Sequence, residues 1–413
     1  MLRSRPDACP GAWRRHDAAD GALARFRPVG GATSPAELRM LAGAAALGGS
    51  PLELTSRGSW QVRGLAASTA DDLADALRAD RPDALLDARG RDIPCGLLAS
   101  PRSTRLDEVA GRLAEALRGR TDVPGRLLIA LQDGPGGDVS GQGADITVVL
   151  TPSGPRSGEN ARSGPRSGPL DAEPTAALLL DGPHGVVDTG LRHLDPAAIA
   201  LAAVDAFTAR RNTAWRVREL DEGTRAAVVA DVRDRTTADV VTPELLPGPP
   251  DPTALGPGED GTLEVLPRLG ELDGPAVATL VTVLEAQDAT LRATPWRTLV
   301  LRGLTDPDDA VRRVAGLVET DPTSRWRGLS ACVGAPRCVK SLADVRGDLA
   351  DAVASGHAGG RVRQHWVGCA RACGTPGGRV AVVEALDVSS GAGGRDEQRG
   401  TYRTVVRSGR VTG

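Results

Sequence analysis

The chain has 413 residues, enough for two to four compact domains that each bury a core of their own. Its 50 basic and 53 acidic residues give a formal net charge of −3, so charge predicts neither nucleic acid nor an anionic membrane surface as a partner. No apolar run approaches the ~18 residues of a membrane span, and the first residues lack the apolar segment of a secretory signal. We therefore expect a cytoplasmic protein whose cysteines are reduced.

The most informative pattern outside the cysteines is an internal repeat. Residues 28–65 recur as residues 267–304, without gaps and at a constant offset of 239 residues. Both copies end in Arg-Gly-Leu. Further identities are Pro28/Pro267, Gly31/Gly270, Leu41/Leu280, Leu52/Leu291 and Thr55/Thr294.

Each copy predicts a helix followed by two strands. Ser34 is a good N-cap, Pro35 takes the first helical position and Glu37 completes a capping box, while Asp273 is the cap of the second copy. Alternating segments predict strands at 52–56, 59–65, 290–294 and 297–304. With a preceding strand, each copy is too small to bury its own core well, so we expect the two to pack around a pseudo-twofold axis.

The segments outside the repeat predict two α/β regions. The expected elements are helices at 68–80 and 195–212, strands at 125–134, 144–152 and 361–368, and a further α/β unit that starts at residue 306. Residues 153–169 repeat Ser-Gly-Pro-Arg-Ser-Gly and have almost nothing to bury, which predicts a disordered insertion. Residues 246–261 predict a Pro/Gly linker, and the composition after about residue 388 predicts a loosely ordered tail.

Four of the six cysteines form two tight pairs, Cys332-x5-Cys338 and Cys369-x3-Cys373. Structural zinc sites favour Cys-x2-Cys knuckles, so this spacing is a poor zinc pattern, and unrelated buried thiols are another alternative. An iron–sulfur cluster fits best, because the surrounding Gly, Ala and Pro residues let the backbone approach a cluster closely. A helix between the pairs is expected to bury Leu342, Val345, Leu349 and Val353.

A duplicated half-unit with these two cysteine pairs in the C-terminal lobe resembles the nitrite/sulfite reductase superfamily. Within it, the chain is most similar to the precorrin-3B synthases, in the blocks "CPGAWRRHDAADGALARFRPVGG", "LELTSRGSWQVRGL", "LRATPWRTLVLRGL" and "ACVGAPRCVKSLADVRGDLADAV". The resemblance covers nearly the whole chain except 153–169 and the tail. It implies an α+β fold, with duplicated ferredoxin-like half-domains around a pseudo-twofold axis plus two α/β lobes of the nitrite/sulfite reductase type. The implied domains are the first half-domain at 1–67, the first lobe at 68–246, the second half-domain at 247–306 and the cluster lobe at 307–413.

The resemblance also implies an activity and its cofactors. Precorrin-3B synthases are O2- and NADH-dependent monooxygenases that hydroxylate precorrin-3A at C20 and close a lactone in aerobic cobalamin biosynthesis. The implied cofactors are a [4Fe–4S] cluster, with Cys332, Cys338, Cys369 and Cys373 as ligands, and a non-haem iron whose ligands the sequence does not give. In sirohaem-containing relatives the last of these cysteines also bridges to the haem iron. The chain shows no dinucleotide-binding fingerprint, so NADH is expected to act through a separate reductase.

Five arginines are the predicted substrate-binding residues, and no catalytic residue is predicted. Arg57 takes the place of the arginine that grips tetrapyrrole carboxylates or the bound anion in the relatives. Guanidinium groups bind carboxylates through paired hydrogen bonds, and a precorrin carries many carboxylate arms. The other four are Arg63, Arg126, Arg297 and Arg302.

Two other functions stay open at this point. A compact sirohaem-dependent sulfite or nitrite reductase needs several cations around a small anion, and the segment "VPGRLLIA" supplies Arg126 without a second cation. A cluster-bearing electron carrier would bind no tetrapyrrole. Trp60 and Trp296 are candidate walls for a flat macrocycle. His16, His184, His193, His357 and His365 are possible iron ligands, although lone histidines are usually structural, and His365 could instead support a cluster ligand.

Overall fold

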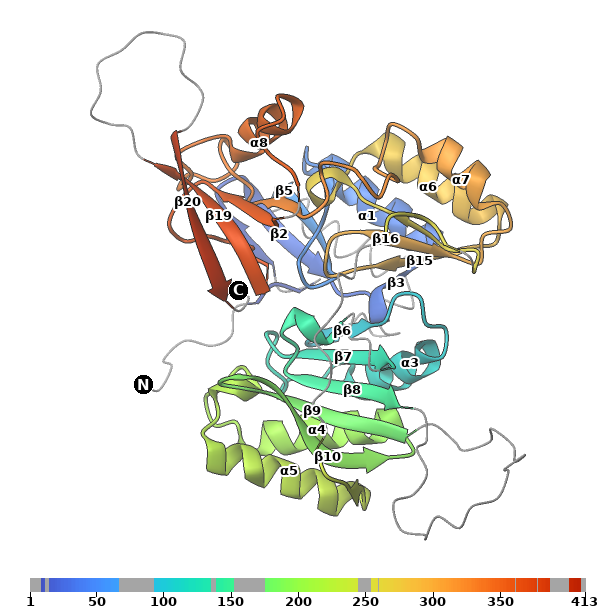
Figure 1. Ribbon diagram of the computed structural model, residues 1–413, viewed down its shortest axis with the longest axis vertical. Coiled ribbons are helices and arrows are strands. Elements are labelled where there is room, and N and C mark those ends of the chain that lie inside the picture. The colour runs from blue at the N-terminus through green and yellow to red at the C-terminus, as the bar shows by residue number, and fades with distance from the viewer. Residues whose placement is uncertain are drawn as a thin grey trace, which may run out of the picture.

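The computed structural model describes residues 9–11, 15–66, 93–134, 139–151, 175–243, 254–258, 260–360, 362–376, 378–386 and 401–409. These residues form seven α-helices and four sheets of four to six strands, which is the mixed α+β class expected from the sequence (Figure 1). The predicted helix at 68–80, the insertion at 153–169 and most of the linker at 246–261 lie outside them. Among the described helices, none has the length and apolar character needed to cross a membrane.

The two copies of the repeat form two five-stranded sheets that exchange a strand. In spatial order the first sheet contains β1 (His16–Ala18), β2 (Gly21–Phe26), β5 (Trp60–Leu65), β4 (Leu52–Leu54) and β14 (Glu271–Leu272). The second contains β12 (Gly256–Pro257), β13 (Leu263–Val265), β16 (Leu299–Arg302), β15 (Thr290–Ala293) and β3 (Ala32–Thr33). Each copy thus supplies the last strand of the other's sheet. The strand register is the same in both copies: Arg25 pairs with Gln61 in the first, and the equivalent residues Glu264 and Val300 pair in the second.

One helix of each copy packs against these sheets. Helices α1 (Pro35–Leu47) and α6 (Gly274–Ala286) contact each other, and their buried faces share one apolar core with both sheets. The predicted capping box is present, since Ser34 Oγ accepts a hydrogen bond from Glu37 N and Glu37 Oε2 accepts one from Ser34 N. Asp273 Oδ1 caps α6 by accepting from Ala276 N. Each such cap stabilises its helix by about 1 kcal/mol.

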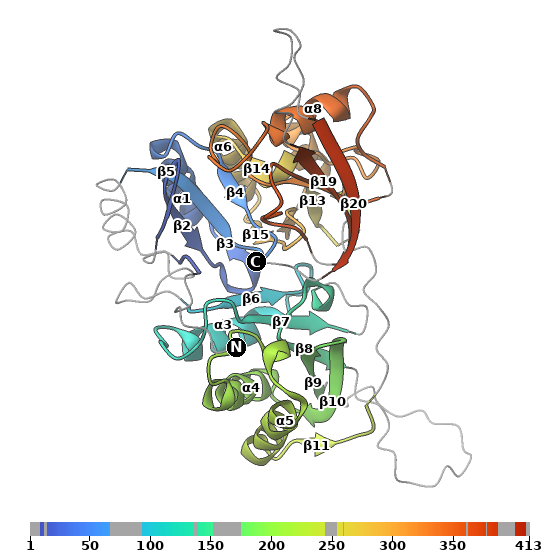
Figure 2. The same ribbon diagram turned by 90° about the vertical axis from the view of Figure 1, so that its left-hand side faces the viewer.

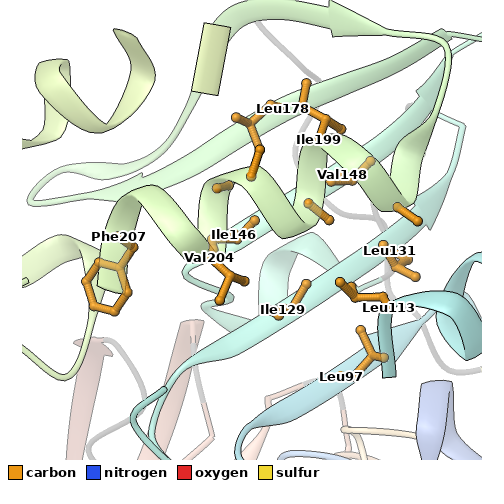
Figure 3. Close-up of a cluster of buried hydrophobic side chains, with 14 of the residues drawn as sticks. Leu97, Leu113, Ile129, Leu131, Ile146, Val148, Leu178, Ile199, Val204 and Phe207 are labelled. Atoms are coloured by element: carbon orange, nitrogen blue, oxygen red, sulfur yellow. The ribbon is translucent and has the colours of Figure 1, made fainter. Parts of the chain in front are cut away.

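The first lobe is a six-stranded sheet covered by helices. Its strands, in spatial order, are β11 (Asp239–Val240), β10 (Gly185–His193), β9 (Thr175–Gly182), β8 (Ile146–Thr151), β7 (Leu128–Asp133) and β6 (Gly96–Ala99). Its helices are α3 (Leu106–Leu117), α4 (Pro196–Arg210) and α5 (Glu222–Thr236). Figure 3 shows Ile199, Val204 and Phe207 of α4 packed over strand residues such as Ile129 and Ile146. The β6 edge of the lobe lies nearest the two-copy unit, and β6 contacts the turn at 29–31 (Figure 2).

The cysteine lobe is a four-stranded sheet in the order β17 (Leu329–Ala331), β18 (Gln364–Val367), β19 (Gly378–Leu386) and β20 (Thr401–Gly409). Helix α8 (Val345–Ala354) packs on this sheet, whereas α7 (Pro307–Val314) packs on α6. The prediction of a loosely ordered tail is wrong for β20, which pairs with β19 along its whole length. The predicted helix face buries Val345, Leu349 and Val353, but Leu342 precedes the helix and is 52% exposed.

Candidate functional site

A cavity of about 510 Å³ lies where the first-copy sheet, a second-copy turn and the cysteine loops meet. Its floor is formed by β2, β4 and β5. Arg57, Arg126 and Arg297 also line the cavity. The cysteine lobe supplies Cys332 and Cys373 to the same cavity. Pockets of this size hold cofactors and drug-sized ligands in other proteins.

The floor is the polar face of a sheet whose other face is core. Side chains alternate along a strand, so Gln61 and Arg63 face the cavity while Trp60 and Val62 face the core. Gln61 joins two neighbouring strands, because its Oε1 accepts from Arg25 Nη2 at 2.9 Å and its Nε2 donates to Glu53 Oε2 at 2.7 Å. These bonds hold the floor residues in fixed positions.

Four of the five predicted substrate-binding arginines line the cavity, but their charges are not equally available. Arg63 donates twice, at 3.0 Å, to the carboxylate of Asp20, so an internal partner already neutralises it. Arg57 Nη1 donates to the carbonyl oxygen of Arg126 at 3.2 Å, and the Arg126 guanidinium lies 4.8 Å from the centre of the Trp215 ring. Burial, and secondarily the charge of Arg216, lower the pKa of Arg57 to about 10.

Arg297 supplies a further cation to the cavity. Its Nη2 donates to the carbonyl oxygen of Gly374, the residue after Cys373, at 3.3 Å. Burial, and secondarily the charge of Arg363, lower its pKa to about 10. Among the described residues, neither Arg57 nor Arg297 has a carboxylate within ion-pair distance. An anion in the cavity would therefore relieve the cost of burying two positive charges.

The structure does not bring Arg302 to this cavity. Arg302 Nη2 donates to Asp107 at 2.6 Å and Nη1 donates to the carbonyl oxygen of Ser103, both at the start of α3. Its position therefore does not support the prediction that it binds substrate. Arg302 is the repeat equivalent of Arg63, and their different partners come from segments far apart in the chain.

The two cysteine pairs lie at one edge of the cysteine lobe. Strands β17 and β18 are parallel neighbours, and Cys332 directly follows β17 while Cys369 follows β18 after one glycine. The carboxyl ends of parallel strands meet at the same edge of a sheet, so both cysteine loops leave from one place. Burial raises the pKa of Cys332, and the nearby thiols of Cys373 and Cys338 raise it further. Cys338 and Cys373 thus both lie near Cys332.

The backbone around these thiols suits a cluster. Gly368 N lies 3.3 Å from Cys332 Sγ and donates to it, which is the N–H to sulfur contact that stabilises thiolate ligands. A Cβ on Gly368 would lie 1.7 Å from Ser341 Oγ, so this loop packs tightly only because the residue is glycine. Within the described residues, no three His, Cys, Asp or Glu side chains are grouped to hold a single metal ion. A cubane cluster has a different requirement, because each thiolate binds a different iron.

Arg346 ties the cysteine lobe to the first-copy sheet. Its Nε donates to the carbonyl oxygen of Cys332 at 3.1 Å, and its Nη1 bonds Glu53 and Glu271. Glu53 and Glu271 lie directly opposite each other in β4 and β14. Like charges in that position repel, so Arg346 stabilises the exchanged strand and positions Cys332 at the same time.

His365 supports the second cysteine pair. Its ring is fully buried, with Nε2 donating to the carbonyl oxygen of Cys373 and Nδ1 2.9 Å from Ser330 Oγ. Burial, and secondarily Arg297, lower its pKa to about 3, so the ring is neutral. This geometry agrees with the alternative that His365 supports a cluster ligand.

Neither predicted tryptophan wall faces the cavity. Trp60 is fully buried and donates to Thr33 Oγ1, and Trp296 donates to Glu264 on the second-copy sheet. Of the histidines, His16 lines the cavity, whereas His193 bonds the backbone of Asp195 at the start of α4.

Three charged cavity residues were not predicted from the sequence: Arg25, Glu53 and Arg346. The alternation of β2 and β4 places Arg25 and Glu53 on the same face as Gln61, which is a signal that the sequence does contain. The reach of Arg346 from α8 to that face depends on the packing of distant segments.

Comparisons with known proteins agree with this architecture. Residues 16–80 match the nitrite/sulfite reductase ferredoxin-like half domain. The whole fold is similar to the structure of Mycobacterium tuberculosis NirA protein, with a TM-score of 0.67 and 17% sequence identity over 93% of this chain and 74% of that one. No curated protein matches the sequence.

Proposed function

We propose that the protein is an oxidoreductase that binds a carboxylate-bearing tetrapyrrole next to a [4Fe–4S] cluster. The observation that carries the proposal is the cavity itself, which is lined by Cys332, Cys373 and two half-buried arginines, Arg57 and Arg297. Neither arginine has a carboxylate partner among the residues that the structure describes. The matched half-domain belongs to a family of redox enzymes, and members of that family usually contain a [4Fe–4S] cluster and sirohaem.

The chain's own residues divide the work at this site. Arg57 and Arg297 bind and orient carboxylate arms, and Gln61 holds Arg25 and Glu53 in place on the cavity floor. Cys332, Cys338, Cys369 and Cys373 are the residues that would hold the cluster, which would supply electrons one at a time to the ligand in the cavity. Arg346 and His365 keep the two cysteine loops at their positions.

Sulfite or nitrite reduction at sirohaem is the finer assignment that the comparisons favour. The half-domain match and the NirA-like fold support it. The sequence around Arg126 supplies only one cation, but Arg25, Arg57 and Arg297 line the cavity as well. In this assignment Cys373, which lines the cavity, would be one of the residues that hold the cluster, and Arg57 would bind the small anion.

Hydroxylation of precorrin-3A is the second candidate, supported by the four sequence blocks that resemble precorrin-3B synthases. One local observation favours it: Leu128, two residues after Arg126, is buried in an apolar cluster and gives the cavity no second cation from that strand. This reaction also requires O2, electrons from NADH through a separate reductase, and a non-haem iron.

Anaerobic purification followed by absorption spectroscopy and analysis of iron, sulfide and extracted tetrapyrrole tests the proposal. Anion reduction is supported if the protein contains cluster iron and sulfide and shows a sirohaem Soret band. Assays of sulfite and nitrite turnover with reduced methyl viologen then test that activity directly. A cluster without sirohaem, and conversion of precorrin-3A in the presence of O2, support the monooxygenase. A protein that takes up no cluster and binds no tetrapyrrole contradicts the proposal as a whole.

A further inference from the structure

Arg297 occupies a backbone position that the other copy of the repeat gives to glycine. In the first copy Gly58 N donates to the carbonyl oxygen of Thr55, and in the second copy Arg297 N donates to that of Thr294. The φ angles at these equivalent positions are +61° for Gly58 and +65° for Arg297. A side chain in this left-handed conformation costs about 1–2 kcal/mol, and such strain persists mainly where a residue has a function.

The surroundings direct the Arg297 side chain between the cavity and the Cys373 loop. A Cβ on Gly270 would lie 2.9 Å from Arg297 Cδ, so the glycine makes room for the arm. Arg297 lines the cavity, its guanidinium also donates to Gly374, and a Cβ on Gly374 would lie 3.7 Å from Nη2. One cation therefore borders both the ligand space and the loop of a predicted cluster cysteine.

In the described part of the chain, no carboxylate forms an ion pair with Arg297. The carboxylate that acts on it most is Glu53, which already binds Arg346 and Gln61, and Arg363 adds a charge of the same sign. A guanidinium has five N–H donors, and the hydrogen bond to Gly374 uses one of them. A carboxylate in the cavity is thus the stronger partner for this side chain.

We propose that Arg297 links occupancy of the cavity to reduction of the cluster. With the cavity empty, the guanidinium stays on Gly374 and its positive charge favours the more negative, reduced cluster. When a carboxylate arm enters, the guanidinium turns to it, and the cluster becomes harder to reduce. Binding couplings are reciprocal, so the oxidised protein binds the anionic ligand more tightly than the reduced protein by the same factor. This inference rests on the proposed cluster and tetrapyrrole site.

A redox titration followed by electron paramagnetic resonance tests the link. The protein is reconstituted with its cluster, one electron per cluster is supplied by a low-potential reductant, and the titration is run with and without uroporphyrin as a polycarboxylate probe. The variants are Arg297→Gly, which suits the backbone angle, and Arg312→Gln, which removes one positive charge from the exposed surface of α7. An absorbance titration of the oxidised protein measures uroporphyrin binding separately.

We expect uroporphyrin to lower the equilibrium constant for reduction about tenfold in the wild type and in Arg312→Gln, a shift of about 59 mV for one electron. In Arg297→Gly the constant should be about tenfold lower already without uroporphyrin, and the probe should change it by less than about threefold. An equal effect of uroporphyrin in Arg297→Gly and the wild type, or no effect in the wild type, overturns the link alone. Absence of a reducible cluster or of uroporphyrin binding overturns the proposed function and the link with it.

Discussion

Replacing Arg57 is expected to make the fold more stable and the site weaker. Arg57 is half-buried, and its partial burial together with the like charge of Arg216 lowers its pKa to about 10. At about 1.4 kcal/mol for each pKa unit, this drop corresponds to roughly 3 kcal/mol against the charged form. The Arg57→Met variant removes that cost and loses the hydrogen bond to the Arg126 carbonyl, which is worth about 1 kcal/mol. We therefore expect the free energy of unfolding to rise by about 2 kcal/mol.

The same substitution should weaken ligand binding. A charge-assisted hydrogen bond to a carboxylate contributes about 2 kcal/mol, and its loss corresponds to roughly 30-fold in affinity. Uroporphyrin binding, followed by absorbance, measures this effect. A gain in stability with a loss of affinity identifies Arg57 as a residue kept for binding rather than for folding.

Arg63 provides the matched control. It lies on the same sheet and lines the same cavity, but it is paired with Asp20, and the two side chains are 10% and 13% exposed. Arg63→Met leaves that carboxylate buried without its partner, so we expect a loss of about 3 kcal/mol. Urea unfolding followed by tryptophan fluorescence compares the two variants at equal m-values. The reasoning is refuted if Arg57→Met lowers stability as Arg63→Met does.

Three further predictions concern the cysteines, the repeat and the tail. Cys373→Ser should lose cluster iron and sulfide, whereas Cys95→Ser, in the core of the first lobe, should keep both; equal content in both variants would argue against Cys373 as a ligand. Gly31→Ala places a Cβ 2.3 Å from a backbone oxygen at a residue with φ +83°, so it should lower the free energy of unfolding in urea by about 3 kcal/mol. Gly43→Ala, whose Cβ enters open space on α1, should raise it by about 1 kcal/mol. Tyr402 is the chain's single tyrosine, and burial together with a hydrogen bond to a carboxylate raises its pKa. Its contribution to stability is therefore complete below the ordinary tyrosine pKa of about 10 and falls as the pH rises above that value. Tyr402→Phe should reduce this alkaline loss of stability, and phenolate absorbance should appear well above the usual pH; an ordinary titration curve would contradict the reasoning.

The sequence predicted the elements whose signals are local. The capping box at Ser34 and the alternation in β5 and β16 act within a few residues, so helices and strands of the repeat lie where expected. The exchange of β3 and β14 has no local signal, because each strand has two residues and is held by a partner in the other copy. The tail was misjudged because its overall composition outweighed the β-branched run in β20.

The candidate site was predicted unevenly for a related physical reason. Cysteine spacing is a property of the chain itself, and the parallel pairing of β17 and β18 brings the two pairs to one edge. Whether an arginine is available depends instead on long-range partners. Arg63 and Arg302 occupy equivalent positions in the two copies, yet Arg63 forms an ion pair with Asp20 and Arg302 with Asp107.

These partners also explain why the two copies do not form equivalent sites. The repeat relates the cavity residues Arg25, Arg57 and Arg63 to Glu264, Trp296 and Arg302 on the second copy. There Glu264 accepts hydrogen bonds from Trp296 and Thr298 and pairs with Arg102, while Arg302 binds Ser103 and Asp107. The segment 102–107 therefore covers the face that corresponds to the cavity floor. Duplication supplied two similar surfaces. The first lobe satisfies the charges of one, while on the other Arg57 faces the cavity without a carboxylate partner among the described residues.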